Sequence, residues 1–384
     1  MERIIKAAVD RGATDLHIKA GDVFRARING QLVPLTKQAL TPEQTKAIAL
    51  RLISNEEDRS RIDRILDYDC SWGASGIGRF RVNILRQRSS FMIVLRVIPF
   101  EVPSFEKLGL PSSLADVALA DRGLVVVTGR RGAGKSSALA GMLHHINQSV
   151  NRHIVTLESP IEFLHRDLQS SVTQREVGVD TPTFREGMRA ALRQDPDVIV
   201  IGDMRDTESM DTALKAVEMG YRVITCLDAV DATSAVQRMI ALFPPDEQVT
   251  ARLRLAEALH SVIALRAVPR PDGDGRATAV ELLLLTPMMR DILIEGTRLG
   301  ELRELIGAAR EQWGMQTFDQ HLLELVEANV VTADSALAAA SRPSEMEPKI
   351  GHLRRRTPMS TRAVTPPAGI PTFLDDEPPA EPAE

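Results

Sequence analysis

The pattern of apolar positions changes along the chain, and the change separates two regions. In residues 1–98, apolar residues recur over short stretches at helical or alternating spacing. "ERIIKAAVDRG" places its apolar residues on one helical face, and Thr41 followed by Pro42 predicts the start of a second helix. Stretches such as "GRFRVNILRQ" and "FMIVLRVIP" predict strands, and Asn29-Gly30 predicts a hairpin turn. We therefore expect an N-terminal α+β domain.

From about residue 113 the apolar runs become continuous. "LVVVT", "HIVTL", "DVIVIG" and "RVITCL" follow one another with helical patterns between them. Continuous apolar runs are typical of parallel strands that are covered on both faces. The sequence predicts an α/β domain over residues 113–342, with a helix-rich part from about 246 to 340.

Two segments lack such patterns. Residues 99–112 hold three prolines and predict a linker between the domains. Residues 343–384 are rich in proline, basic at first and acidic at the end, and offer little to bury. This composition predicts a disordered tail.

Composition narrows the class of protein. The net charge is −5 and aromatic residues make up 4%, which disfavours a nucleic-acid translocase. Cys70 and Cys226 are far apart and form no CxxC pair, which indicates a reducing compartment and gives no zinc site. The chain has no apolar run of the ~18 residues that a membrane span needs, and its N-terminus lacks a signal-peptide core. We expect a soluble, intracellular protein that is at most peripheral to a membrane.

The glycine-rich stretch after "LVVVT" carries the strongest chemical signal. "GRRGAGKS" fits G-x-x-x-x-G-K-[ST], and it stands between a predicted strand and the predicted helix "SSALAGMLHHINQ". Backbone N–H groups of such a loop surround phosphate, and the helix N-terminus favours the negative charge. Lys135 is expected to reach the β- and γ-phosphate oxygens, and Ser136 to hold Mg²⁺.

We therefore predict a site for ATP and Mg²⁺ on this loop. Its residues are Gly129, Arg130, Arg131, Gly132, Ala133, Gly134, Lys135, Ser136 and Ser137. Two interpretations of Arg130 and Arg131 stay open. The simpler one is solvated side chains at the tip of the loop, and the other is contact with phosphate or with a neighbouring subunit.

Further strings resemble one family. "ATDLHIKAG", "GRFRVNILRQR", "HIVTLESPIEF", "QREVGVDTPTFREGMRAALRQDPDVIVIGDMRD" and "GMQTFDQHLLELV" occur in the order found in PilT-like type IV pilus retraction ATPases of the secretion ATPase superfamily. The resemblance covers roughly residues 1–335. It implies a RecA-like P-loop ATPase core with a smaller, PAS-like N-terminal domain.

The same resemblance implies an assembly, a cellular location and partners. Such a protein forms a homo-hexamer at the cytoplasmic face of the inner membrane and uses ATP to drive pilus retraction, the basis of twitching motility. An inner-membrane platform protein is its implied partner, a second pilus ATPase is a further candidate partner, and no nucleic acid is expected.

The resemblance also implies roles for single residues at the positions that match the family's motifs. Glu158 matches the glutamate that positions the attacking water. Asp203 stands where the family has the Walker B glutamate, and a carboxylate there can also hold Mg²⁺. Arg81 and Arg96 resemble the N-terminal arginines that reach the nucleotide.

Other positions depart from the family pattern. Ser159 replaces an aspartate, Tyr221 and Asp228 replace histidines, and Ala264 stands where glutamine is common. Asp228 matters most, because two like charges ~4 Å apart repel by ~4 kcal/mol at an effective dielectric of ~20. It must point away from the γ-phosphate, pair with an arginine, or weaken phosphate sensing.

Two functional hypotheses remain. The first is an ATP-driven retraction motor. The second is a nucleotide-binding accessory or regulatory subunit that hydrolyses weakly and works with an active pilus ATPase.

Overall fold

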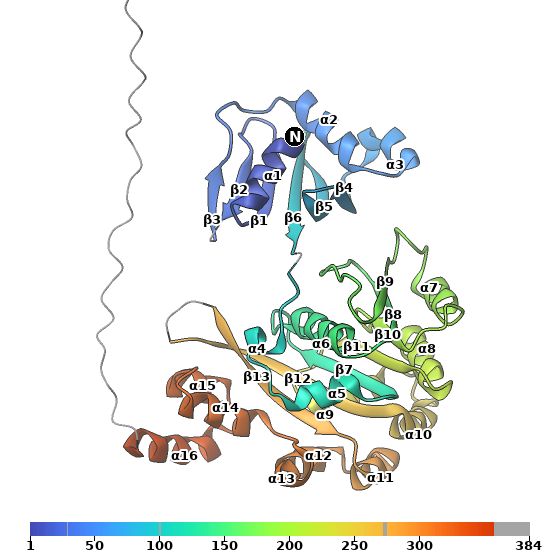
Figure 1. Ribbon diagram of the computed structural model, residues 1–384, viewed down its shortest axis with the longest axis vertical. Coiled ribbons are helices and arrows are strands. Elements are labelled where there is room, and N and C mark those ends of the chain that lie inside the picture. Colours follow the sequence, from blue (N-terminus) through green and yellow to red (C-terminus); the bar gives the residue numbers. More distant parts are fainter. Residues whose placement is uncertain (29, 100, 272–274, 357–384) are drawn as a thin grey trace, which may run out of the picture.

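The chain folds into two domains that meet at a linker after strand β6 (Ser90–Ile98) (Figure 1). The computed structural model describes residues 1–28, 30–99, 101–271 and 275–356. Asn29 of the predicted hairpin turn lies outside them. No helix in these ranges is both long and apolar enough to span a membrane.

The N-terminal domain is an antiparallel sheet with helices packed against it. Its remaining elements are α1 (Glu2–Asp10), β1 (Ala13–Lys19), β2 (Arg25–Ile28), β3 (Gln31–Pro34), α2 (Pro42–Leu52), α3 (Glu56–Ser60), a 3₁₀ turn (Ile62–Arg64), β4 (Asp67–Ala74) and β5 (Gly78–Gln87). The strand order is β3-β2-β1-β6-β5-β4. Thr41 caps α2 in a reciprocal capping box with Gln44. The predicted α+β domain is confirmed.

The second domain is built around a mixed sheet. Its first elements are α4 (Phe105–Leu108), α5 (Ser113–Leu119), β7 (Gly123–Gly129), α6 (Lys135–Ser149), β8 (His153–Glu158), β9 (Ser171–Glu176), α7 (Phe184–Ala191), β10 (Val198–Ile201), α8 (Thr207–Glu218) and β11 (Arg222–Leu227). The rest are α9 (Ala232–Ala241), α10 (Gln248–Ala258), β12 (Leu259–Pro269), β13 (Arg276–Leu284), α11 (Pro287–Glu295), a 3₁₀ turn (Leu299–Glu301), α12 (Leu302–Ala308), α13 (Arg310–Trp313), α14 (Phe318–Glu327), α15 (Ala333–Ala339) and α16 (Pro343–Arg356).

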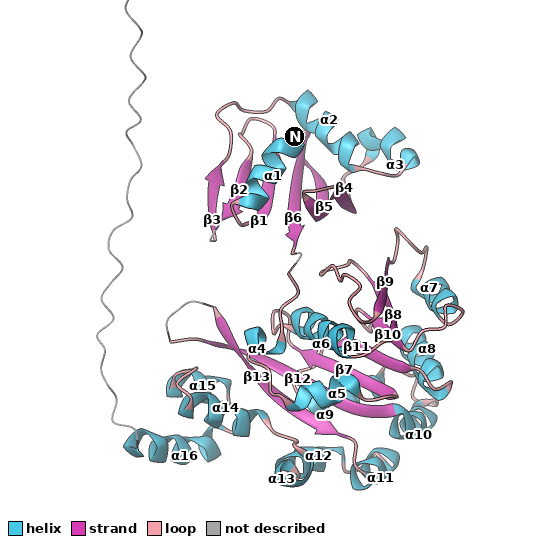
Figure 2. Cartoon of the chain, in the orientation of Figure 1, coloured by secondary structure: helices cyan, strands magenta, loops and turns pink. Residues whose placement is uncertain are grey.

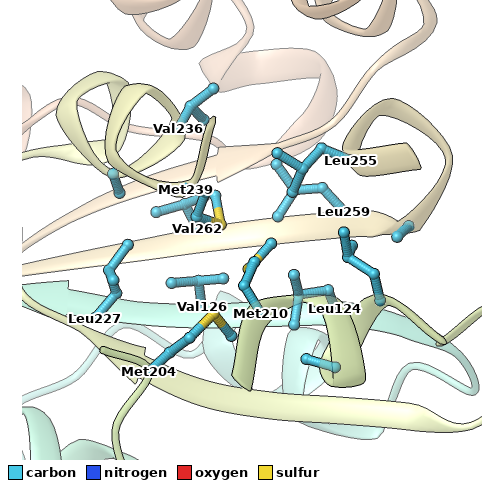
Figure 3. Close-up of a cluster of buried hydrophobic side chains, with 14 of the residues drawn as sticks. Leu124, Val126, Met204, Met210, Leu227, Val236, Met239, Leu255, Leu259 and Val262 are labelled. Carbon is cyan, nitrogen blue, oxygen red and sulfur yellow. The ribbon is translucent and has the colours of Figure 1, made fainter. Parts of the chain in front are cut away.

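The sheet of this domain carries the nucleotide loop. Its order is β13-β12-β7-β11-β10-β8-β9, and all neighbours pair in parallel except β12 with β13. Helices lie on both faces (Figure 2). Every residue of β7, β10 and β11 is buried, as the continuous apolar runs predict. On one face, side chains of β7, β12, α8 and α9 interlock in a single apolar cluster (Figure 3). Because β7, β8, β10, β11 and β12 run in parallel, their carboxyl ends lie at one edge of the sheet.

One part of the predicted helix-rich region is wrong. Residues 259–284 form the hairpin strands β12 and β13 instead of helices. Most of β12 is buried because it lies inside the sheet between β7 and β13. A long apolar run of this kind fits a buried helix and a buried strand equally well.

The predicted disorder from residue 343 is also wrong in its first part. Residues 343–356 form helix α16, and Met346 and Ile350 are buried against an apolar cluster that includes Phe318 and Leu322 of α14. Residues 357–384 lie outside the described ranges. The predicted linker contains the short helix α4, whose Phe105 packs in the core beside α6.

Candidate nucleotide site

The glycine-rich loop connects β7 to α6 at the carboxyl edge of the sheet. Gly134 has a φ of 97° where α6 begins, a left-handed conformation that glycine adopts at little cost. No side chain of the part of the chain that the structure describes caps this helix, so its first-turn N–H groups remain available to an anion. Ser136 and Ser137 lie in that first turn and line the adjoining cleft. The loop thus has the backbone form that phosphate binding requires.

The predicted loop residues divide into two groups. Gly132, Gly134 and Lys135 line the cleft together with the two serines, and so does Arg131 from the exposed tip. Gly129 and Ala133 are buried beneath the loop, and Arg130 is exposed without lining the cleft.

Lys135 is held by two oxygen atoms. Its Nζ donates to the carbonyl oxygen of Gly129 at 3.0 Å and forms an ion pair with Asp228 Oδ1 at 2.7 Å. Parallel pairing of β11 with β7 sets Leu227 opposite Thr128, which brings Asp228 to the start of the loop. The sequence left open whether Asp228 points away or pairs with an arginine. It pairs with the lysine of the loop.

Glu158 ends β8 at the wall of the same cleft. Its Oε1 accepts hydrogen bonds from Thr156 Oγ1 at 2.7 Å and Gln174 Nε2 at 3.1 Å. Burial raises the pKa of Glu158, and the hydrogen bonds to its carboxylate offset part of that rise. A carboxylate whose pKa moves toward neutrality is a better proton acceptor for water than an exposed one.

Asp203 follows β10, the strand next to β8, and lines the cleft near Glu158. Its Oδ2 accepts from Arg205 Nε at 2.7 Å. Within the described residues, no three His, Cys, Asp or Glu side chains are grouped as a complete metal site. The Ser136 hydroxyl and the Asp203 carboxylate supply hard oxygen donors on one cleft, a set that fits Mg²⁺ held also by phosphate oxygens.

Both predicted N-terminal arginines reach the cleft, but they differ in their partners. Arg96 Nε donates to Asp15 Oδ1 at 2.9 Å, whereas Arg81 has no ion pair within the described ranges. The cleft therefore lies between the two domains. Its volume is about 1040 Å³, large enough for a nucleotide.

A contact between the domains was missed from the sequence. Glu176 of β9 is buried and accepts from Ser71 Oγ at 2.5 Å and Arg79 Nη2 at 2.9 Å. Ser71 and Arg79 belong to β4 and β5 of the N-terminal domain. Nothing local in "QREVG" signals this partner, since the residues are about a hundred positions apart.

Two of the positions where the sequence departs from the family pattern lie away from the cleft. Tyr221 precedes β11 at the amino edge of the sheet, and Ala264 is buried inside β12 opposite Thr128. Ser159 does line the cleft beside Glu158. Of these four positions, Ser159 and Asp228 line the cleft.

Known proteins are similar to this chain in sequence and in fold. The family model described as type II/IV secretion system protein matches residues 1–288. The type IV pilus ATPase PilU of Pseudomonas aeruginosa is 39% identical over 347 residues, which cover 90% of each chain. The type IV pilus retraction ATPase PilT of the same organism is 35% identical over 340 residues, 88% of this chain and 98% of PilT.

A solved structure agrees with these relatives. The crystal structure of the pilus retraction motor PilT with bound ADP matches with a TM-score of 0.82 and 38% identity, covering 91% of this chain and 99% of that one. The resemblance read from the sequence and the RecA-like core are thereby confirmed. This chain belongs to the type II/IV secretion system protein family, in the group of type IV pilus ATPases that includes PilT and PilU.

Proposed function

We propose that the chain is a subunit of a hexameric ATPase that couples ATP hydrolysis to type IV pilus retraction. One observation carries the proposal: the phosphate loop with Lys135 and Ser136 lines the same cleft as Glu158 and Asp203. Binding groups and candidate water-activating groups thus stand around one volume. The similarity to PilT and PilU supports the type IV pilus as the structure that this ATPase would act on.

Each residue of the cleft would have its own role in binding and hydrolysing ATP. Loop N–H groups and Lys135 would bind the phosphates. Ser136 with Asp203 would hold Mg²⁺, which would neutralise phosphate charge. Glu158 orients water and accepts its proton, since its pKa is raised by burial. Arg81 reaches the nucleotide from the N-terminal domain. The shorter Asp203 withdraws the Walker B carboxylate by about 1 Å, which can slow a reaction by ~100-fold.

A second function is favoured by the ion pair of Lys135 with Asp228. A carboxylate that occupies the loop lysine opposes phosphate binding and supplies no proton to the γ-phosphate. The chain would then be an accessory subunit that binds nucleotide, hydrolyses weakly and works with an active pilus ATPase.

Steady-state Mg-ATP hydrolysis by the full-length protein separates the two functions, with Lys135→Ala as the blank. We expect turnover above the blank, and a rise in Asp203→Glu and in Asp228→His. Turnover equal to the blank with ATP binding intact would reject the motor and support the accessory subunit.

The assembly and location follow from the proposal. We expect a homo-hexamer at the cytoplasmic face of the inner membrane, bound to the pilus platform protein. Native mass spectrometry with and without nucleotide tests the ring, and a monomer under both conditions would contradict it.

A further inference from the structure

The carboxylate of Asp228 contacts the lysine that is expected to bind phosphate, with Oδ1 at 2.7 Å from Lys135 Nζ. Lys135 Nζ has three donors, and two of them already point to Asp228 Oδ1 and the Gly129 carbonyl. The Lys135 side chain is only 15% exposed. In a phosphate loop this ammonium group must turn to the β- and γ-phosphates of a bound nucleotide. Asp228 therefore stands as an internal substitute for phosphate.

The surroundings hold Asp228 near the lysine without locking it. Its backbone is fixed because Leu227 pairs with Thr128 in the buried sheet. Its side chain is 60% exposed and can leave the lysine without losing a buried contact. Among the nearby cations, Arg205 donates to Asp203 rather than to Asp228. Lys135 is thus the partner that a nucleotide takes away from Asp228.

We propose that Asp228 sets nucleotide affinity and selectivity by competing with phosphate for Lys135. The proposal rests on the proposed nucleotide-binding function of the cleft. After displacement Asp228 remains beside the phosphates as a like charge, and the repulsion grows with the charge of the nucleotide. Asp228 therefore weakens binding of ATP more than binding of ADP, which lacks the γ-phosphate. Mg²⁺ reduces this difference because it neutralises phosphate charge.

Equilibrium titration of the full-length chain tests the proposal. The Kd values of ATP and ADP are measured by calorimetry, with and without Mg²⁺, for the wild type and Asp228→Asn. Asparagine keeps the size of the side chain and removes its charge. Asp69→Asn is the matched control: Asp69 lines the same cleft and accepts from Asn83 Nδ2 at 3.3 Å, whereas the partners of Lys135 Nζ among the described residues are Gly129 and Asp228.

We expect Asp228→Asn to lower the Kd of Mg²⁺-free ATP by about three- to fivefold, the upper part of the range for one partly exposed ion pair. The Kd of ADP should fall less, Mg²⁺ should narrow the gap, and Asp69→Asn should change each Kd by less than about twofold. A charge effect of the cleft as a whole would give both variants the same shift and would overturn the proposal. So would unchanged Kd values, or an equal gain for ATP and ADP.

Lys135→Ala separates this inference from the proposed function. If the wild type binds ATP through Lys135 but Asp228→Asn binds no tighter, only the role of Asp228 is rejected. If neither the wild type nor Asp228→Asn binds ATP, both the proposed function and the inference fail. In the double variant Lys135→Ala with Asp228→Asn, the gain from removing the carboxylate should shrink, because its partner is gone.

Discussion

Acidification should destabilise the second domain through one buried histidine. His321 of α14 is 7% exposed, and its Nδ1 accepts a hydrogen bond from Val280 N–H of β13 at 2.9 Å. A protonated ring cannot accept that bond. Burial lowers the pKa of His321 from 6.5 to about 4, and the charge of Arg310 acts in the same direction.

The direction of the pH effect on stability follows from the number of protons bound by the folded and the unfolded chain. Between pH 6.5 and 4 the unfolded chain binds a proton at His321 that the folded chain does not, so the free energy of unfolding falls as pH falls. A shift of this size amounts to about 3 kcal/mol in full, of which about 2 kcal/mol is lost between pH 7 and pH 5.

His321→Asn is the informative variant, because an amide oxygen can accept from Val280 N–H without titrating. Urea unfolding at pH 7 and pH 5 is the assay. The variant should be less stable than the wild type at pH 7 by about 1 kcal/mol, because it loses ring contacts, and more stable at pH 5. If the difference between the two proteins is the same at both pH values, the reasoning is wrong.

Three further changes test the loop, the sheet and the domain contact. Gly129→Ala puts a Cβ 2.7 Å from the Leu265 carbonyl oxygen. The free energy of unfolding, measured by thermal unfolding, should fall by about 1–3 kcal/mol, and titration with ATP should show that binding is lost. Arg222 is buried, and its Nε and Nη1 have no hydrogen-bond partner among the described residues, so Arg222→Met should raise the free energy of unfolding in urea by about 1–3 kcal/mol. Glu176→Gln removes a charge-assisted bond to Arg79, which is partly solvated, and should weaken the domain contact by about 1–2 kcal/mol. Hydrogen exchange in β9 would then accelerate, and adding Arg79→Gln should cost little more.

The interior of the fold was predictable because buried parallel strands are apolar throughout. β7, β8, β10 and β11 each stand where a continuous apolar run predicts them. β9 was missed because it is an edge strand and "SVTQRE" is largely polar. β4 is also an edge strand, and it was missed although "DYDCSWGA" places apolar residues at every second position, the pattern of a half-exposed strand. Helix α16 was missed because the packing of Met346 and Ile350 on α14 is a tertiary contact.

The site was predictable where its residues are contiguous or follow a strand. The phosphate loop, Glu158 and Asp203 come together because their strands end at one edge of the sheet. The partner of Asp228 was not predictable, because it depends on the register of β11 against β7. Glu176 was missed since its partners belong to the other domain.

The distribution of ion pairs indicates how a nucleotide would act on the two domains. On the core side, Lys135 and Arg205 are paired with Asp228 and Asp203, so a phosphate must exchange partners with them. Among the described residues, Arg131 at the tip of the loop and Arg81 of the N-terminal domain line the cleft without an ion pair, so their charges can meet phosphate without displacing a carboxylate. Phosphate charge should therefore draw the N-terminal domain toward the core. Loss of the γ-phosphate would weaken that pull, which gives hydrolysis a direct route to domain movement.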